Sequence, residues 1–197
     1  MCPINNGNER IQSNKSSMLS REEIKAIEFW ISQMGEYHFF TTTEQRIVPA
    51  KNILKFKYKM IGHGYNRIVY DLNNGYILKI ALSEIGLIGN ANEAYLYNNC
   101  NEEVQKYICP VKEFGSGWII MKKMDTNVSH EIMEYAKLIE LELIFLSYGI
   151  IPIDLRLANV AISEDNEMVA IDYGLFTMDL KSPVLQWMFD DGSTKDQ

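Results

Sequence analysis

The chain has 197 residues, and 47% of them are hydrophobic, so it can bury the core of one domain. Acidic residues outnumber basic ones by 26 to 19, and the formal charge of −7 argues against broad electrostatic binding to nucleic acid or to an anionic membrane. The longest apolar run, residues 143–153, is far shorter than the ~20 residues that span a bilayer, so no membrane segment is expected. Because of the acidic charge, no nucleic-acid partner is expected either.

The N-terminal region divides into a tail and a helix. Residues 1–19 are rich in Asn, Ser and charge and poor in aliphatic side chains, which predicts a flexible tail. Ser20 and Glu23 then form a capping-box pattern, and apolar residues recur at helical spacing up to Gly35. We expect an amphipathic helix over residues 20–35 that packs on the following sheet or recruits a partner.

Residues 52–81 carry the two-residue period of β-strands. From Asn52 onward, the apolar residues Phe56, Tyr58 and Met60 alternate with lysines, which predicts a strand whose lysines lie on the solvent-exposed face. Two further strands, residues 68–72 and 76–81, are joined by an Asn-Asn-Gly turn at 73–75 that tolerates positive φ. This part of the chain is expected to begin an antiparallel sheet.

A helix and a strand pair are expected next. The helix is predicted over residues 90–108, and the strands near 111–114 and 118–124, interrupted by a Gly-Ser-Gly turn at 115–117.

The last third of the chain contains a second helical pattern. Five apolar residues step by four, three, four and three before Gly149: Ile132, Ala136, Ile139, Leu143 and Leu146. We expect this stripe to be buried in a second layer. A small hairpin over residues 159–162 and 168–171 should follow it.

Two features of the predicted sheet carry possible chemistry. Gly62 and Gly64 lie at the end of the first strand, although glycines there also fit a plain hairpin turn. Lys79 lies on the apolar face of the third strand, where a charge is costly unless it is paired or reaches water at the strand edge. Glu93 is its natural partner, although Asn90 to Glu93 also fits a capping box.

Two Asp residues and one Asn form an ordered set near the C-terminus. Asp154 follows an apolar run, Asn159 lies five residues later, and Asp172 ends another apolar run thirteen residues after Asn159. Each alone could be a turn residue. Carboxylate and amide oxygens suit Mg²⁺, which takes its other ligands from water and phosphates, so the set predicts a metal and phosphate site.

The segment from Gly62 to Gly174 resembles a protein-kinase-like domain, with the signature elements in the family's order. The resemblance implies these nucleotide-binding residues: Gly62, Gly64, Val69, Lys79, Glu93 and Met121. In the resemblance, Lys79 contacts the α- and β-phosphates, Glu93 orients Lys79, and Met121 begins the gatekeeper and hinge segment, residues 121–123, beside adenine. The implied cofactors are ATP and Mg²⁺.

The same resemblance assigns the transfer chemistry. It implies that Asp154 is the catalytic base, that Arg156 steadies the γ-phosphate, and that Asn159 and Asp172 are metal ligands. The implied fold is α+β and two-lobed: an antiparallel small-lobe sheet at about 20–124 and a reduced helical large lobe at about 125–197.

Several positions depart from the family pattern. Arg67 replaces the third glycine of the loop, Ile77 replaces a small residue that faces adenine, and Pro152-Ile153 precedes Asp154 where the family has a His and an Arg. Only 23 residues follow Gly174, which leaves no room for a peptide-docking lobe. In its short length the chain resembles the RIO and Bud32 types and the short kinase-like effectors of some bacteria.

Three functional hypotheses follow. The first is a small atypical serine/threonine protein kinase that depends on ATP and Mg²⁺. The second is a kinase of a small molecule, which the missing docking lobe favours. The third is a pseudokinase that acts as a protein-binding module. A protein substrate or partner is expected. The three cysteines without CxxC spacing and the absence of a signal-peptide pattern predict a cytoplasmic protein, or one delivered into a host cell if it is an effector.

Overall fold

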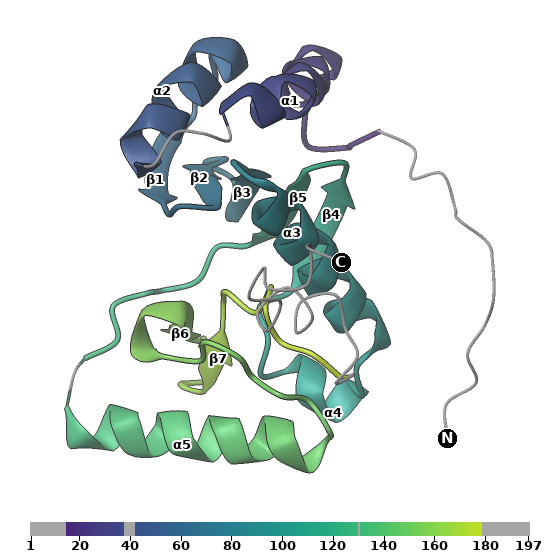
Figure 1. Ribbon diagram of the computed structural model, residues 1–197. Helices are drawn as coiled ribbons and strands as arrows, with labels where there is room; N and C mark the ends of the chain where they lie inside the picture. Colours follow the sequence, from purple (N-terminus) through teal and green to yellow (C-terminus); the bar gives the residue numbers. More distant parts are fainter. Residues whose placement is uncertain (1–14, 38–41, 130, 179–197) are drawn as a thin grey trace, which may run out of the picture.

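The structure is a computed structural model that describes residues 15–37, 42–129 and 131–178. Within them the chain has an α+β architecture, as predicted, built on a five-stranded antiparallel sheet with the order β1-β2-β3-β5-β4 (Figure 1). The strands of this sheet are β1 (Lys59–His63), β2 (Arg67–Asp71), β3 (Tyr76–Ala81), β4 (Val111–Gly115) and β5 (Trp118–Lys122). A separate hairpin is formed by β6 (Val160–Ile162) and β7 (Met168–Ala170).

Two N-terminal helices, α1 (Arg21–Gln33) and α2 (Thr43–Leu54), cover one face of the sheet, and the short 3₁₀ helix η1 (Met34–Tyr37) follows α1 (Figure 1). Ser20 and Glu23 form the predicted capping box of α1. Trp30 of α1 is fully buried, and its Nε1 donates a hydrogen bond to Ala81 O of β3 at 2.7 Å. The predicted helix therefore packs on the sheet.

The sheet separates two hydrophobic cores, because alternate strand residues point to opposite faces. The outer core, beneath α1 and α2, includes Ile68, Leu78 and Ile120. The inner core includes Ile119 and Met121 together with residues of later helices and of the β6–β7 hairpin. Those helices are α3 (Glu84–Asn99), α4 (Glu102–Gln105), α5 (Ile132–Ser147) and the 3₁₀ helix η2 (Leu157–Asn159).

The helix predicted over residues 90–108 has different bounds. It begins at Glu84, where the Ser83 side chain accepts a hydrogen bond from Gly86 N, and it ends at Asn99 before the short α4. Gly86 and Gly89 lower the helix propensity of its first turns, which hid this start in the sequence. Gly86 packs so closely on the neighbouring loop that a Cβ would lie 2.1 Å from Asn66 O.

The first strand also differs from its prediction. Residues 52–54 belong to α2, Lys55 takes a left-handed φ of 48°, and β1 begins only at Lys59. Phe56 lies in the connection and packs edge-on against the Tyr70 ring, 5.4 Å away. The alternation of lysines with apolar residues therefore lies mostly in a packed connection and enters the strand only at Lys59 and Met60.

The apolar stripe predicted to be buried on α5 faces outward instead. Ile132 and Leu143 are 89% and 61% exposed, whereas Leu141 and Phe145 are 2% and 0% exposed on the opposite side. Because α5 is apolar on two faces, the helical period alone could not show which face packs inward.

Part of the predicted tail makes contacts. The backbone N–H of Ser17 donates to the Glu113 carboxylate at 3.2 Å, and Leu19 is buried in the outer core. Residues 1–14 of the predicted tail lie outside the described residues. Among the residues that the structure does describe, no helix is both long and apolar enough to cross a membrane.

The two faces of α5 can be compared directly by mutation. We expect Leu141→Ala to lower the free energy of unfolding by about 2–5 kcal/mol, because it opens a cavity in the inner core. Leu143→Ala should change it by less than about 0.5 kcal/mol, since its side chain lies at the surface. Urea unfolding of both variants measures the difference. Equal losses in the two variants would show that the outer stripe is packed.

Candidate functional site

The site is centred on an ion pair between β3 and α3. Lys79 Nζ lies 3.0 Å from Glu93 Oε1 and 3.3 Å from Oε2, and the two residues are only 5% and 0% exposed. Because α3 begins at Glu84, Asn90 lies inside the helix, and the alternative capping box for Glu93 does not form. Lys79 is therefore paired rather than extended to water.

The ion pair also fixes the backbone around Asp172. Lys79 Nζ donates to Ile171 O at 2.7 Å, and Glu93 Oε1 accepts from Tyr173 N at 3.2 Å. The buried Tyr173 side chain donates from its hydroxyl to Cys109 O at 2.7 Å. Asp172, between these anchored residues, is held beside the ion pair.

Gly174 follows this segment where the chain touches α3. A Cβ at Gly174 would lie 2.9 Å from the Cα of Gly89, so the two backbones need glycine here. Asn92 Nδ2 donates to Gly174 O at 3.0 Å and strengthens the contact. The Asp-Tyr-Gly sequence is thus clamped on the helix that carries Glu93.

Asp154 and Asn159 form the second half of the site. Asn159 Nδ2 donates to Asp154 O at 2.8 Å and to Asp154 Oδ2 at 3.1 Å, while Asn159 O accepts from Ile171 N at 2.9 Å. Asp154 has a left-handed φ of 61°, and its side chain is 46% exposed. Arg156 Nε lies 3.3 Å from Asp154 Oδ1 and is mostly exposed. One connected set of hydrogen bonds therefore joins Lys79 to Asp154.

Arg67 is a site residue whose role the sequence did not reveal. Its NH1 lies 2.9 Å from Glu93 Oε2, and its NH2 pairs with Asp172 Oδ1. Burial disfavours the ionised form of Asp172, but the charges of Arg67 and Lys79 outweigh it and lower the pKa of Asp172. The sequence feature that could have indicated this role is a charged residue at the start of β2, on the same face of the sheet as Lys79.

The remaining predicted residues share one face of the sheet. Val69 pairs with Gly62 on β1 and with Lys79 on β3, and Ile77 pairs with Met121 on β5. Residues that pair across an antiparallel sheet point to the same side, so these side chains all face α3 and the Asp172 segment. Val69 and Ile77 are partly buried, whereas Met121 is fully buried in the inner core.

The glycine-rich turn is anchored at its tip by an N-terminal helix. Tyr65 follows Gly64, its hydroxyl accepts a hydrogen bond from Arg46 NH2 at 2.7 Å, and the Arg46 guanidinium lies 4.0 Å from its ring centroid. Gly64 N donates to Arg67 O at 2.9 Å, which closes the turn. The helix α2, which lies outside the kinase resemblance, thus holds the turn in place.

Asn159 and Asp172 are the two side chains that could hold a divalent cation. Within the described residues, no group of three or more His, Cys, Asp or Glu could hold one alone. Asn159 donates from Nδ2 to Asp154, so its amide oxygen is the atom that would bind a metal ion, and the Asp172 side chain is 44% exposed. An amide and a carboxylate oxygen fit Mg²⁺ that takes its other ligands from phosphates and water.

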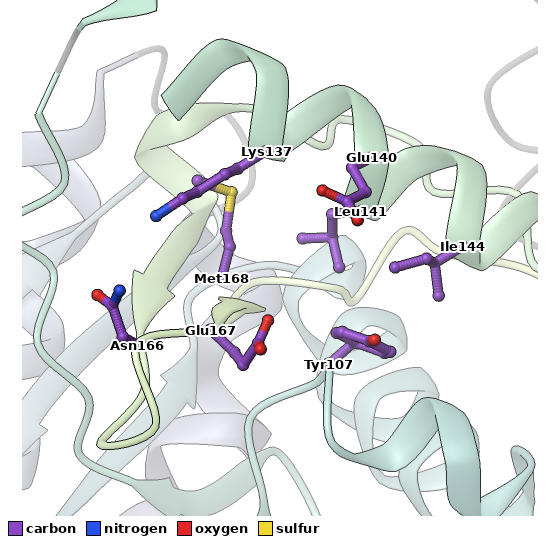
Figure 2. Close-up of a pocket in the computed structure, with 8 residues that line it drawn as sticks. All are labelled: Tyr107, Lys137, Glu140, Leu141, Ile144, Asn166, Glu167 and Met168. Atoms are coloured by element: carbon purple, nitrogen blue, oxygen red, sulfur yellow. The ribbon is translucent and has the colours of Figure 1, made fainter. Parts of the chain in front are cut away.

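A pocket of about 210 Å³ lies elsewhere, between α5 and the β6–β7 hairpin (Figure 2). None of the predicted site residues lines it. Figure 2 shows Lys137 of α5 pointing to the side of the pocket where Asn166 lies. Its lining residues are Tyr107, Lys137, Glu140, Leu141, Ile144, Asn166, Glu167 and Met168.

Comparisons with known proteins give matches only among solved structures. No protein-family model matches the chain, and no curated protein matches it. The 2.2 Å crystal structure of WbdD matches with a TM-score of 0.49 and 16% identity, over 67% of this chain and 36% of that chain. A co-crystal structure of WbdD with the kinase inhibitor LY294002 matches with a TM-score of 0.48 and 16% identity, over 68% of this chain and 36% of that chain.

A third structure, described as the bifunctional kinase-methyltransferase WbdD, gives a TM-score of 0.45 and 16% identity, over 64% of this chain and 33% of that chain. The chain thus spans about a third of the length of these structures. The expected similarity to the RIO and Bud32 types stays a prediction.

Glu93 should matter more for stability than Lys79, because it neutralises two buried cations. We expect Glu93→Gln to lower the free energy of unfolding by about 3–5 kcal/mol, since Lys79 and Arg67 both lose their shared anion. Lys79→Met leaves Glu93 paired with Arg67 and should cost only about 1–2 kcal/mol. Chemical denaturation of both variants tests this order, and a larger loss in Lys79→Met would contradict it.

Proposed function

We propose that the chain is a phosphotransferase that uses ATP and Mg²⁺ and has a protein-kinase-like fold. The observation that carries this proposal is the connected set of contacts from Lys79 through Glu93 and the Asp172 segment to Asn159 and Asp154. These residues are far apart in sequence, and their types and order are those that a nucleotide, a metal and an acceptor hydroxyl require. The division into a small lobe at about 20–124 and a reduced large lobe at about 125–197 belongs to the same proposal.

The cationic side of the site would receive the phosphates. Lys79 is held by Glu93 on the inner face of the sheet, so its charge is fixed before a nucleotide arrives. Asn159 and Asp172 would hold Mg²⁺, which supplies positive charge against the phosphate oxygens when bound. Arg156, exposed beside Asp154, can reach a γ-phosphate from the solvent side.

Asp154 would receive the acceptor's proton. In the transfer, the acceptor oxygen forms a bond to the γ-phosphorus, the bond from that phosphorus to the β–γ bridging oxygen breaks, and ADP leaves. The hydroxyl proton passes to the Asp154 carboxylate. Asn159 holds this carboxylate at 3.1 Å and so fixes its direction.

The glycine-rich turn supports the proposal because the space beside its two glycines is not filled by the protein's own atoms. Gly62 and Gly64 have φ values outside the left-handed region; a Cβ at Gly62 would meet only Val69, 3.9 Å away, and one at Gly64 would meet nothing within 4 Å. The protein's own packing therefore does not require glycine at either position. Close approach of phosphate groups to the backbone is a reason for glycine that the fold itself does not supply.

We propose a serine or threonine hydroxyl on a protein as the acceptor. Asp154 and Arg156 have side chains that are 46% and 63% exposed, so the base lies where a macromolecular hydroxyl can reach it. A second candidate function, a protein-binding module without transfer, is favoured by the pairing of Asp172 with Arg67, which already occupies one carboxylate oxygen.

Phosphate transfer should depend on Asp154. Asp154→Asn suits the left-handed φ and keeps the contact with Asn159, but it cannot accept a proton. We expect it to lower transfer at least about 100-fold while the free energy of unfolding changes little. The assay follows γ-³²P from ATP with Mg²⁺ into a protein extract and, separately, into a metabolite extract.

The matched control is Asp165→Asn, which changes an exposed acid in the β6–β7 turn and should leave transfer unchanged. Unimpaired transfer by Asp154→Asn would rule out Asp154 as the base. Absence of transfer by the wild-type chain to both extracts would favour the binding module.

A further inference from the structure

We propose that Arg67 is a built-in counter-cation for Asp172 that lets the site bind a nucleoside triphosphate with little dependence on Mg²⁺. The proposal deepens the proposed function and rests on its nucleotide site. It concerns the residue that stands where the resemblance places the third glycine of the loop.

The residue before Arg67 is held by hydrogen bonds and close packing. Asn66 O accepts a hydrogen bond from Leu82 N at 2.7 Å, and the Asn66 side chain accepts one from Ser83 Oγ at 2.8 Å. Gly86 at the start of α3 lies directly against Asn66 O. Arg67 therefore begins β2 from a fixed position rather than from a mobile turn.

The guanidinium is equally well fixed. Arg67 pairs in register with Ala81 of β3, two residues along the strand from Lys79. Its side chain therefore projects from the same inner face of the sheet as Lys79. A Cβ built at Gly89 would lie 3.8 Å from its Cζ, an ordinary van der Waals distance, so the guanidinium lies against α3. The side chain is 13% exposed and reaches Glu93 with one nitrogen and Asp172 with the other. The planar guanidinium presents separate N–H donors, and here these serve two carboxylates at once.

The charges in this cluster cancel only because Arg67 is present. Lys79 and Arg67 supply two positive charges, and Glu93 and Asp172 supply two negative charges. Without Arg67 the cluster would carry a net charge of −1. An uncompensated carboxylate repels a triphosphate unless a metal ion lies between them. A fixed guanidinium removes that repulsion, and a metal ion must compete with it for Asp172.

The ratio of nucleotide affinities with and without metal tests this role. Isothermal titration with the non-hydrolysable analogue AMP-PNP gives the dissociation constant Kd of the full-length chain in excess MgCl₂ and in EDTA. We expect the wild-type Kd to rise less than about threefold on removal of Mg²⁺. In Arg67→Met the same ratio should increase at least about tenfold, because the cluster becomes anionic.

Two further variants separate charge from structure. Arg67→Lys retains the charge and should keep the low wild-type ratio, even if its fit is poorer. Arg21→Met removes an exposed arginine from α1 and should leave both Kd values unchanged. Equal ratios in wild type and Arg67→Met, or a ratio in Arg67→Lys as high as in Arg67→Met, would overturn the proposal. Absence of AMP-PNP binding by the wild type under both conditions would overturn the proposed nucleotide site itself, and this inference with it.

Discussion

The buried carboxylate of Glu93 is the constraint on which the rest of the site depends. It lies inside the protein with no exposed surface, and ion pairs with Lys79 and Arg67, together with the Tyr173 backbone N–H, satisfy it. A buried anion without such partners would be strongly unfavourable. Since its partners come from β2, β3 and the segment after β7, this one side chain requires three distant parts of the chain to meet. The fold and the candidate site are therefore stabilised by the same contacts.

The sheet positions the charged cluster of Arg67, Lys79, Glu93 and Asp172. One face packs an apolar core against α1 and α2, which anchors the strands. The other face presents Val69 and Lys79 toward α3 and the Asp172 segment. Glycine at 174 lets this segment lie directly on α3, which shortens the distance between Glu93 and Asp172. A polar cluster thus forms at the edge of an apolar core, where some of its carboxylate surface stays open to solvent.

Local signals predicted much of this arrangement. The capping box at Ser20 and the turn at 73–75 are short-range patterns, and both form. Lys79 required a partner because a charge on an apolar strand face is costly. The choice of Glu93 as that partner depended on where α3 begins, which glycines within the helix concealed. Arg67 could not be placed, because its contact with Asp172 joins residues 105 positions apart. The face of α5 that packs inward was equally hidden, since that helix is apolar on both sides.

The most direct test of the central claim is whether ATP stabilises the full-length chain through Lys79. With Mg²⁺ and ATP at about 100 times its dissociation constant, the free energy of unfolding should rise by about 2.7 kcal/mol. Lys79→Met keeps Glu93 paired with Arg67 and should fold, but it should gain almost nothing from ATP. No stabilisation of the wild-type chain at any ATP concentration, or the same gain in Lys79→Met, would contradict the assignment of these residues to a nucleotide site.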